Sequence, residues 1–176
     1  NVDKDFYRYF PFSRNHQNKF YLLAFRSFDI LVSIFGILVG IILSPFIMVG
    51  NLIANRGKTF YFQERVGKNG EVFKIVKLRT MNKDAEISGP QFAQKKDLRV
   101  TKFGRFLRRS RLDEIPQFYN VLLGDMSLIG PRPERPVFVD ELSELIPFYD
   151  TRHIIKPGLT GWAQVMANYG DCYDDS

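Results

Sequence analysis

The chain has 176 residues and a net charge of +6, and 45% of its residues are apolar. This length suits one domain with its own hydrophobic core rather than two. Cys172 is the only cysteine, which excludes an intrachain disulfide and a multi-cysteine metal cage. Because the chain begins with Asn1 rather than Met, we expect it to be a fragment or a processed product.

The first predicted element is an uncharged segment of 26 residues from Ile30 to Asn55. It is well beyond the roughly 18 residues that mark a membrane helix. A charged and aromatic lead precedes it, and no small-residue cleavage site follows, so it is not a signal peptide. Pro45 has no amide hydrogen to donate to the carbonyl of Ile41, so a helix through Ser44-Pro45 must kink. At about 1.5 Å per residue, neither arm of the kinked helix crosses a hydrocarbon core of about 30 Å.

Basic residues flank this segment on both sides, and the positive-inside tendency would keep both of its ends in the cytoplasm. A helix that enters the membrane, bends at Ser44-Pro45 and returns satisfies that tendency. A Pro-kinked spanning helix is an alternative that the charges alone leave equally open. A buried core helix fits less well, because the run is long and evenly apolar. The flanking cations are Arg14, Lys19 and Arg26 before the segment, and Arg56, Lys58, Arg65, Lys68 and Lys74 after it.

Residues 56–111 form a basic block that contains 16 Lys/Arg and 5 Asp/Glu. Such a block predicts an anionic partner. Because a membrane segment immediately precedes it, phosphate-bearing substrates and lipid head groups are favoured over nucleic acid.

The block begins with two segments rich in β-branched and aromatic residues, 59–66 and 71–78, which flank an Asn-Gly pair and predict a β-hairpin. Residues 82–100 are polar and are interpreted as a loop. Lys102–Arg109 predicts a helix whose apolar face, with Phe103, Phe106 and Leu107, suits a membrane surface. A solvated helix packed on the core is an equal alternative.

The second half of the chain predicts alternating helices and loops. A helix over Glu114–Leu123 ends at the following glycine. The prolines of Gly130-Pro131-Arg132-Pro133 require an extended loop, which holds one arginine rigidly. Val137–Leu145 predicts an acidic helix, and a tight loop over 156–161 precedes a possible strand at Trp162–Met166.

The candidate chemical group is Asp113-Glu114, directly after a run of arginines. Arginine forks match phosphate oxygens, and neighbouring cations keep a carboxylate ionised as a nucleophile or metal ligand. Acid and arginine together therefore predict phosphoryl transfer. The alternative is that Asp113 caps a helix, with Pro116 in its first turn. The arginines are Arg108, Arg109 and Arg111.

Three ordered blocks of this sequence resemble the monotopic polyprenyl-phosphate phosphoglycosyl transferases, the bacterial sugar transferase family. The blocks are FKIVKLRTM (73–81), LRRSRLDEIPQFYNVLLGDMSLIGPRP (107–133) and KPGLTGWAQV (156–165), and the likeness runs from about Lys19 to Ala167. The resemblance implies a re-entrant helix broken at Ser44-Pro45. It therefore predicts an α+β, mainly helical monotopic membrane protein with interfacial amphipathic helices and a small β-hairpin or sheet.

The resemblance also implies a reaction. Asp113 is expected to attack the sugar-bearing phosphate of a UDP-sugar and release UMP, after which polyprenyl (undecaprenyl) phosphate attacks the aspartyl-phosphosugar. Asp113 is expected to contact Mg²⁺, and Glu114 to assist the second step or to position the groups. This would be the first membrane step of exopolysaccharide or O-antigen synthesis, on the cytoplasmic face of the bacterial inner membrane. The expected phosphate-binding residues are Arg79, Arg108, Arg132 and Lys156, the last at a position where relatives often carry Arg.

We expect three parts along the chain: a lead over residues 1–18, the membrane helix over 19–55 and a catalytic domain over 56–176. Some relatives carry a multi-span region upstream and further helices downstream, so we expect both to be missing here. Two other functions stay open. One is a basic membrane-anchored interaction module without catalysis, and the other is a phosphohydrolase that uses the same acid and arginines.

Overall fold

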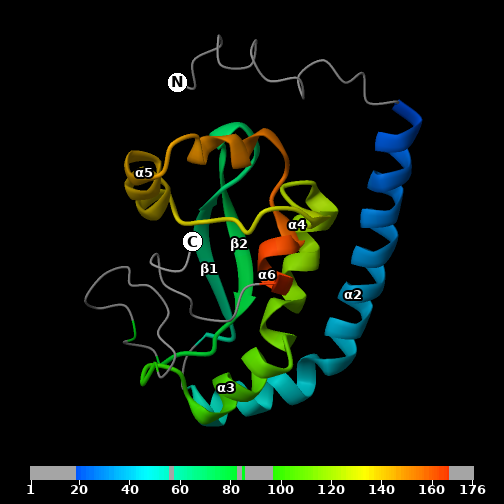
Figure 1. Cartoon of the computed structure of the whole chain (residues 1–176). Coiled ribbons are helices and arrows are strands. Elements are labelled where there is room, and N and C mark those ends of the chain that lie inside the picture. Colours follow the sequence, from blue (N-terminus) through cyan, green and yellow to red (C-terminus); the bar gives the residue numbers. More distant parts are fainter. Residues whose placement is uncertain (1–18, 56–57, 83–84, 86–96, 167–176) are drawn as a thin grey trace.

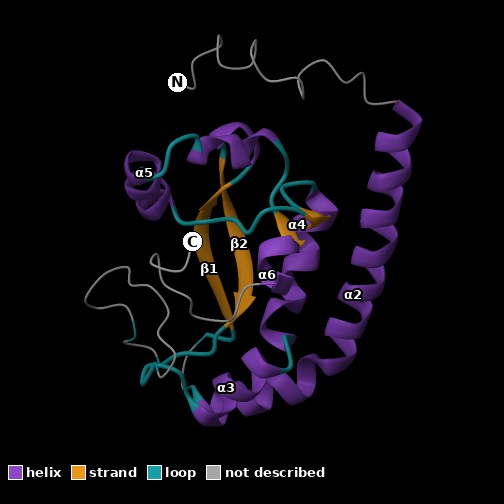
Figure 2. Cartoon of the chain, viewed as in Figure 1, coloured by secondary structure: helices purple, strands orange, loops and turns teal. Residues whose placement is uncertain are grey.

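A computed structural model describes residues 19–55, 58–82, 85 and 97–166. The predicted lead over 1–18 and most of the predicted loop over 82–100 lie outside this part of the chain. The described part is mostly helical with a small sheet, as expected (Figure 2). Its helices and strands are α2 (Lys19–Ala54), β1 (Phe60–Val66), β2 (Val72–Leu78), α3 (Lys102–Arg109), α4 (Phe118–Leu123), β3 (Ser127–Ile129), α5 (Pro136–Leu145), β4 (Gly158–Thr160) and α6 (Trp162–Met166). Short 3₁₀ helices are η2 (Lys68–Gly70), η3 (Leu112–Gln117) and η4 (Tyr149–Ile154).

Helix α2 runs along one side of the molecule and changes direction in its second half (Figure 1). Among the described residues it is the one helix long and apolar enough to cross a membrane. Pro45 lies inside it, and the Ser44 hydroxyl donates a hydrogen bond of 2.8 Å to the Ile41 carbonyl. That carbonyl is the one that Pro45 cannot reach, so the serine satisfies a group that the proline leaves free.

Large apolar side chains cover the outer face of α2, while polar contacts fix its inner face. The Asp29 carboxylate accepts hydrogen bonds from the Ser127 hydroxyl at 2.9 Å and from the Leu128 amide at 3.1 Å. Arg26 donates to the carbonyls of Val121 and Leu122 at the C-terminal end of α4. The last carbonyls of a helix are partly negative and have room for a further donor, so the arginine suits them. The apolar helix is therefore firmly tied to the rest of the chain.

The predicted hairpin is confirmed: β1 and β2 pair antiparallel from Phe60 opposite Leu78 to Val66 opposite Val72. At its turn, Asn69 and Gly70 have φ of 58° and 79°, the left-handed conformation that this residue pair favours. Successive residues of a strand point to opposite faces, so the hairpin has two unlike sides. One side carries the pairs Phe60–Leu78 and Phe62–Val76, and the other carries Tyr61–Lys77, Gln63–Ile75 and Arg65–Phe73.

Two small hydrophobic cores hold the elements around this hairpin. One joins the second half of α2 to β2 and α3 through Ile47, Leu78 and Leu107. The other contains Ile75, Val121 and Met126. Within α3 only part of the predicted apolar face is covered: Leu107 is buried, whereas Phe106 is 57% exposed. The helix therefore packs on the core and still presents an aromatic ring outward.

Two expectations about the second half of the chain are wrong. Trp162–Met166 is helix α6, and the strand is the preceding Gly158–Thr160, which pairs in parallel with β3. Alternation of apolar residues over five positions does not separate a strand from a helical turn. The helix expected over Glu114–Leu123 is divided into η3 and α4, because Pro116 lies inside the first turns and supplies no amide hydrogen. Its predicted end is confirmed, with Gly124 at φ of 99°.

Candidate active site

The Asp113-Glu114 pair lies in η3, which the chain enters through a left-handed residue, Arg111, with φ of 59°. Arg111 occupies the N-cap position, so the alternative that Asp113 caps this helix is wrong. The Oδ1 atom of Asp113 is buried and has no hydrogen-bond partner among the described residues. A buried carboxylate oxygen without a partner is costly for folding, and such atoms cluster at functional sites.

Three cations surround Glu114, whose side chain is only 13% exposed. Its carboxylate lies 3.7 Å from Lys77 Nζ, 3.7 Å from an Arg111 nitrogen and 3.9 Å from an Arg132 nitrogen. The three come from β2, the entry to η3 and the loop after β3. Elements far apart in the sequence thus converge on one acid.

Asp113 is less acidic than an exposed aspartate. Burial, and to a smaller extent the charge of Glu114, raise the pKa of its carboxyl to about 6, although Lys77 and Arg108 act in the opposite direction. The sequence predicts that the cations keep this group ionised. At neutral pH the carboxylate is still the main form, but desolvation outweighs the cations.

Lys77 is a site residue that the sequence reasoning missed. Burial lowers the pKa of its ammonium to about 8, and Arg132 lowers it too, while Glu114 acts in the opposite direction. A signal was present, because Lys77 is two residues after the buried Ile75 and therefore on the same face of β2. A lysine on a buried face of a strand is uncommon and indicates a partner or a ligand.

The structure brings two of the four predicted phosphate-binding residues to the dyad. Arg132 contacts Glu114, and Arg108 lowers the pKa of Asp113 while its Nε donates to the Thr80 hydroxyl at 2.9 Å.

The other two make contacts at the margins of the site. Arg79 donates to the Lys58 carbonyl at 2.9 Å and lies over the ring of Tyr61. The pKa of Lys156 is lowered by burial and by nearby Arg26 and Lys68. Within the described part of the chain, neither Arg79 nor Lys156 forms a hydrogen bond or an ion pair with Asp113 or Glu114.

The expected Mg²⁺ fits the oxygen ligands that are present. In the described ranges no group of three or more His, Cys, Asp and Glu side chains forms a cage. Mg²⁺ does not need one, since it commonly binds through one or two carboxylates together with substrate phosphates and water. The partnerless Oδ1 of Asp113 is a suitable ligand atom.

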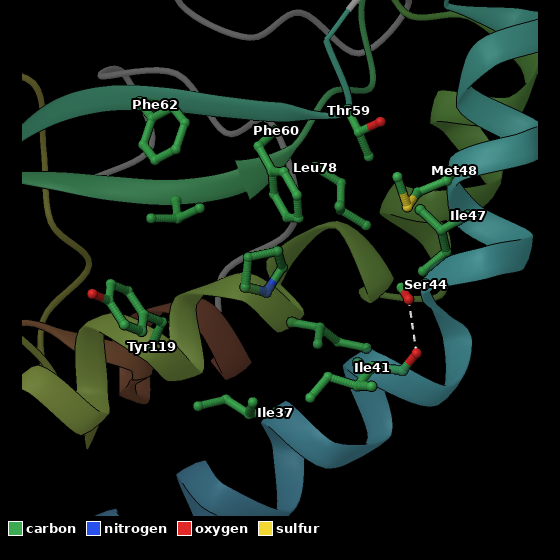
Figure 3. Close-up of a pocket in the computed structure, with 14 residues that line it drawn as sticks. Ile37, Ile41, Ser44, Ile47, Met48, Thr59, Phe60, Phe62, Leu78 and Tyr119 are labelled. Carbon is green, nitrogen blue, oxygen red and sulfur yellow. Dashed lines mark hydrogen bonds between the residues drawn. The ribbon is translucent and has the colours of Figure 1, made fainter.

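An apolar cavity of about 520 Å³ adjoins the dyad (Figure 3). Ile115 and Pro116, the two residues after Glu114, line it. The apolar face of the hairpin and the bend of α2 form its walls, as Figure 3 shows for Phe60, Phe62, Ile41 and Ser44. The site therefore has a charged side, at Lys77 and Arg132, and an apolar side against α2.

The chain is similar in sequence to known proteins. The family model of the bacterial sugar transferases matches residues 20–175. A UDP-N-acetylgalactosamine-undecaprenyl-phosphate N-acetylgalactosaminephosphotransferase of Aeromonas hydrophila is 45% identical over 159 residues, 89% of this chain and 37% of that protein. A UDP-glucose:undecaprenyl-phosphate glucose-1-phosphate transferase of Escherichia coli K12 is 42% identical over 119 residues, 68% of this chain and 26% of that protein.

A shorter relative matches over most of its own length. It is a putative undecaprenyl-phosphate N-acetylgalactosaminyl 1-phosphate transferase of Bacillus subtilis, 43% identical over 154 residues, which are 86% of each chain. The protein belongs to the bacterial sugar transferase family, and the resemblance of its three sequence blocks is confirmed. The chain spans well under half of the A. hydrophila and E. coli relatives.

Proposed function

We propose that the protein transfers a hexose-1-phosphate from a UDP-sugar to undecaprenyl phosphate and releases UMP. The names of its relatives supply both substrate classes. The observation that carries the proposal is the buried, partnerless Oδ1 of Asp113, placed between a cation cluster and an apolar cavity. A soluble sugar nucleotide suits the first side, and a lipid chain suits the second.

In the first step, a carboxylate oxygen of Asp113 attacks the sugar-bearing phosphorus. The bond from that phosphorus to the oxygen bridging to UMP breaks, and UMP leaves with the electron pair. Arg108 and Arg132 hold the phosphate oxygens, since forked cations offset the charge that would repel an anionic nucleophile. A bound Mg²⁺ supplies further neutralisation of the diphosphate.

In the second step, a phosphate oxygen of the lipid acceptor attacks the phosphorus of the aspartyl-phosphosugar. The bond to Asp113 breaks, which restores the carboxylate and yields a lipid diphosphate sugar. Glu114 is the positioning partner, held between Lys77, Arg111 and Arg132. We assign to Arg79 and Lys156 the binding of phosphate groups at the margins of the site.

The acceptor chain is assigned to the apolar cavity beside Ile115 and Pro116. Its wall is the bend of α2 at Ser44-Pro45, which we propose is the turning point of a re-entrant helix. Basic residues on both sides of this helix favour a cytoplasmic site. The lipid phosphate then meets Asp113 at the boundary between membrane and water.

The test uses full-length protein in lipid nanodiscs with Mg²⁺ and UDP-N-acetylgalactosamine, UDP-glucose or UDP-galactose. UMP release is measured with and without undecaprenyl phosphate, and the protein is analysed by mass spectrometry for a phosphosugar on Asp113. Asp113→Asn is expected to abolish the adduct and turnover, because an amide is no nucleophile. Asp140→Asn, on the exposed face of α5, is the matched control.

Each alternative has its own result. An interaction module without catalysis predicts no UMP release from any donor. A phosphohydrolase predicts free sugar phosphate whose yield does not depend on the lipid. Turnover without an adduct at Asp113 would contradict the proposed two-step reaction.

A further inference from the structure

Four buried side-chain atoms lack a hydrogen-bond partner among the described residues, and three of them belong to residues that line one cavity. They are Arg65 Nε, Asp113 Oδ1, Gln117 Nε2 and Gln164 Oε1. Three of these residues, all but Asp113, line one small cavity together with Lys77, Glu114 and Arg132. Buried polar atoms in folded proteins are almost always paired, so their concentration here indicates an absent polar ligand.

Three separate elements bring these atoms together. Gln117 follows Glu114 by three residues in η3, and residues three apart in a 3₁₀ helix lie above one another. Arg65 lies on the face of the hairpin that also carries Lys77. Gln164 reaches the cavity from α6. The Gln117 residue is only 3% exposed, so its amide is aimed into the protein and away from bulk water.

The chemistry of these atoms favours a neutral ligand that both donates and accepts. Arg65 already has an anion, since its guanidinium lies 3.3 Å from the Glu134 carboxylate and also donates to the Pro133 carbonyl. Its free Nε–H and the Gln117 amide donate, whereas the Gln164 oxygen accepts. A phosphate only accepts, so it leaves Gln164 unpaired. A hydroxyl group does both, and also pairs with either end of a glutamine amide.

We infer that Arg65, Gln117 and Gln164 together bind one hydroxyl group of the hexose in the donor. This rests on the proposed function, in which the sugar is one bond from the phosphate that Asp113 attacks and therefore lies beside η3. The nucleoside is one phosphate farther away. The cavity of about 10 Å³ accommodates one hydroxyl group or one water, so the ring would lie at its mouth.

The test replaces each glutamine by methionine, which has a similar length and no amide. Thermal unfolding of the full-length protein is measured with UDP alone and with UDP-N-acetylgalactosamine, UDP-glucose and UDP-galactose. In wild type, the preferred UDP-sugar is expected to stabilise more than UDP. In Gln117→Met and Gln164→Met this excess is expected to disappear while the UDP effect stays, and the KM for the donor rises about tenfold, as for one or two lost hydrogen bonds.

A merely structural role makes a different prediction. Removing a buried amide nitrogen that has no partner, as in Gln117→Met, does not lower the midpoint of the unliganded protein, whereas removing a fully bonded amide does. Asn120→Leu is the matched control, because the Asn120 amide donates to the Lys74 carbonyl and accepts from the Val76 amide. It is expected to lower the midpoint and keep the excess stabilisation by the UDP-sugar.

A second arm uses deoxy analogues of the preferred donor. Deleting the hydroxyl that Gln117 binds is expected to raise KM about tenfold in wild type and to have no further effect in Gln117→Met. Three outcomes overturn the inference: an equal loss of UDP binding, an unchanged excess for the UDP-sugar, or a wild type that does not distinguish UDP-sugars from UDP. Because the thermal-unfolding comparison needs neither lipid nor turnover, it is independent of whether Asp113→Asn abolishes transfer.

Discussion

At the scale of single residues, the pH dependence of transfer should follow Asp113 and Lys77. In the proposed reaction Asp113 attacks as a carboxylate, and burial raises the pKa of this group to about 6. Lys77 supports Glu114 as an ammonium, and burial lowers its pKa to about 8. We therefore expect kcat/KM of the donor to rise with pH through about 6 and to fall above about 8.

The variant Lys77→Arg separates the two limbs of this profile. Arginine stays protonated, so the alkaline limb should move upward while the acid limb stays in place. Initial rates of UMP release at saturating acceptor, measured from about pH 5 to pH 9, provide the comparison. If a residually active Asp113→Glu variant keeps its acid limb at the same pH, that limb belongs to another group.

The buried carboxylate of Asp113 should also lower the free energy of unfolding of the protein. Its pKa in the folded state lies above the value of 3.8 for an exposed carboxyl, so the folded state binds the proton more tightly. Its contribution therefore becomes less favourable as pH rises from about 4 to about 6. Asp113→Asn should be more stable than wild type at pH 7, on the order of 2 kcal/mol, with the difference vanishing near pH 4.

Thermal or denaturant unfolding of both proteins across that range measures the effect. The same substitution thus has opposite consequences for turnover and for stability. A variant that is less stable than wild type at neutral pH would show that the Asp113 carboxylate is held by contacts rather than strained by burial.

A third residue-scale prediction concerns Arg108, which Thr80 positions. Thr80 is 6% exposed, and its hydroxyl accepts from Arg108 Nε at 2.9 Å. Thr80→Val keeps the shape and removes this partner, so kcat/KM should fall about tenfold, as for a hydrogen bond to a charged group. Thr80→Ser should retain most of the activity. Equal losses in both variants would indicate that packing of the threonine methyl is what matters.

At the scale of elements, the packing of α2 on the catalytic part requires small residues. A Cβ atom at Gly36 would lie 2.4 Å from the ring of Phe118 in α4. Gly36→Leu should therefore push the two helices apart and destabilise the protein by about 1–3 kcal/mol. Ile42→Leu, at a position that is 71% exposed, is the control. The unfolding midpoint in one detergent compares them, and equal midpoints would contradict the close contact.

Local signals in the sequence predicted some elements well. The Asn-Gly turn predicted the hairpin, Gly124 predicted the end of α4, and the periodicity of Lys102–Arg109 predicted α3. The pairing of β3 with β4 joins residues about thirty positions apart and has no local signal. The contact of Gln164 with the site depends on that pairing, so the sequence offered no route to it.

The candidate site divides in the same way. Asp113, Glu114 and Arg108 are neighbours in sequence, and their meeting follows from one helix and one turn. Arg132 was expected because its proline-rich loop is rigid. The alternation of β2 places Lys77 on the same face as the buried Ile75, but the many other cations of residues 56–111 hide this signal.

At the scale of the whole molecule, the bend of α2 should decide on which side of the membrane the chain begins. Pro45→Ala restores the amide that can bond to the Ile41 carbonyl, so a straighter helix becomes available. We expect the N-terminal end of α2 to become accessible from the opposite side in part of the population. Labelling of a cysteine introduced at Lys19 in intact and permeabilised cells measures this. Identical labelling in wild type and variant would show that Pro45 does not set the topology.

The unlike faces of the hairpin have a consequence for how inhibitors would act. In the proposed reaction the two-stranded sheet separates the substrates, with the lipid chain against Phe60 and Phe62 and the sugar nucleotide beyond Arg65 and Lys77. The two substrates would therefore reach the Asp113 carboxylate from opposite faces of the hairpin. A compound bound in the apolar cavity would exclude the lipid acceptor, so that the phosphosugar stays on Asp113. A compound bound at the polar side would prevent the sugar nucleotide from binding.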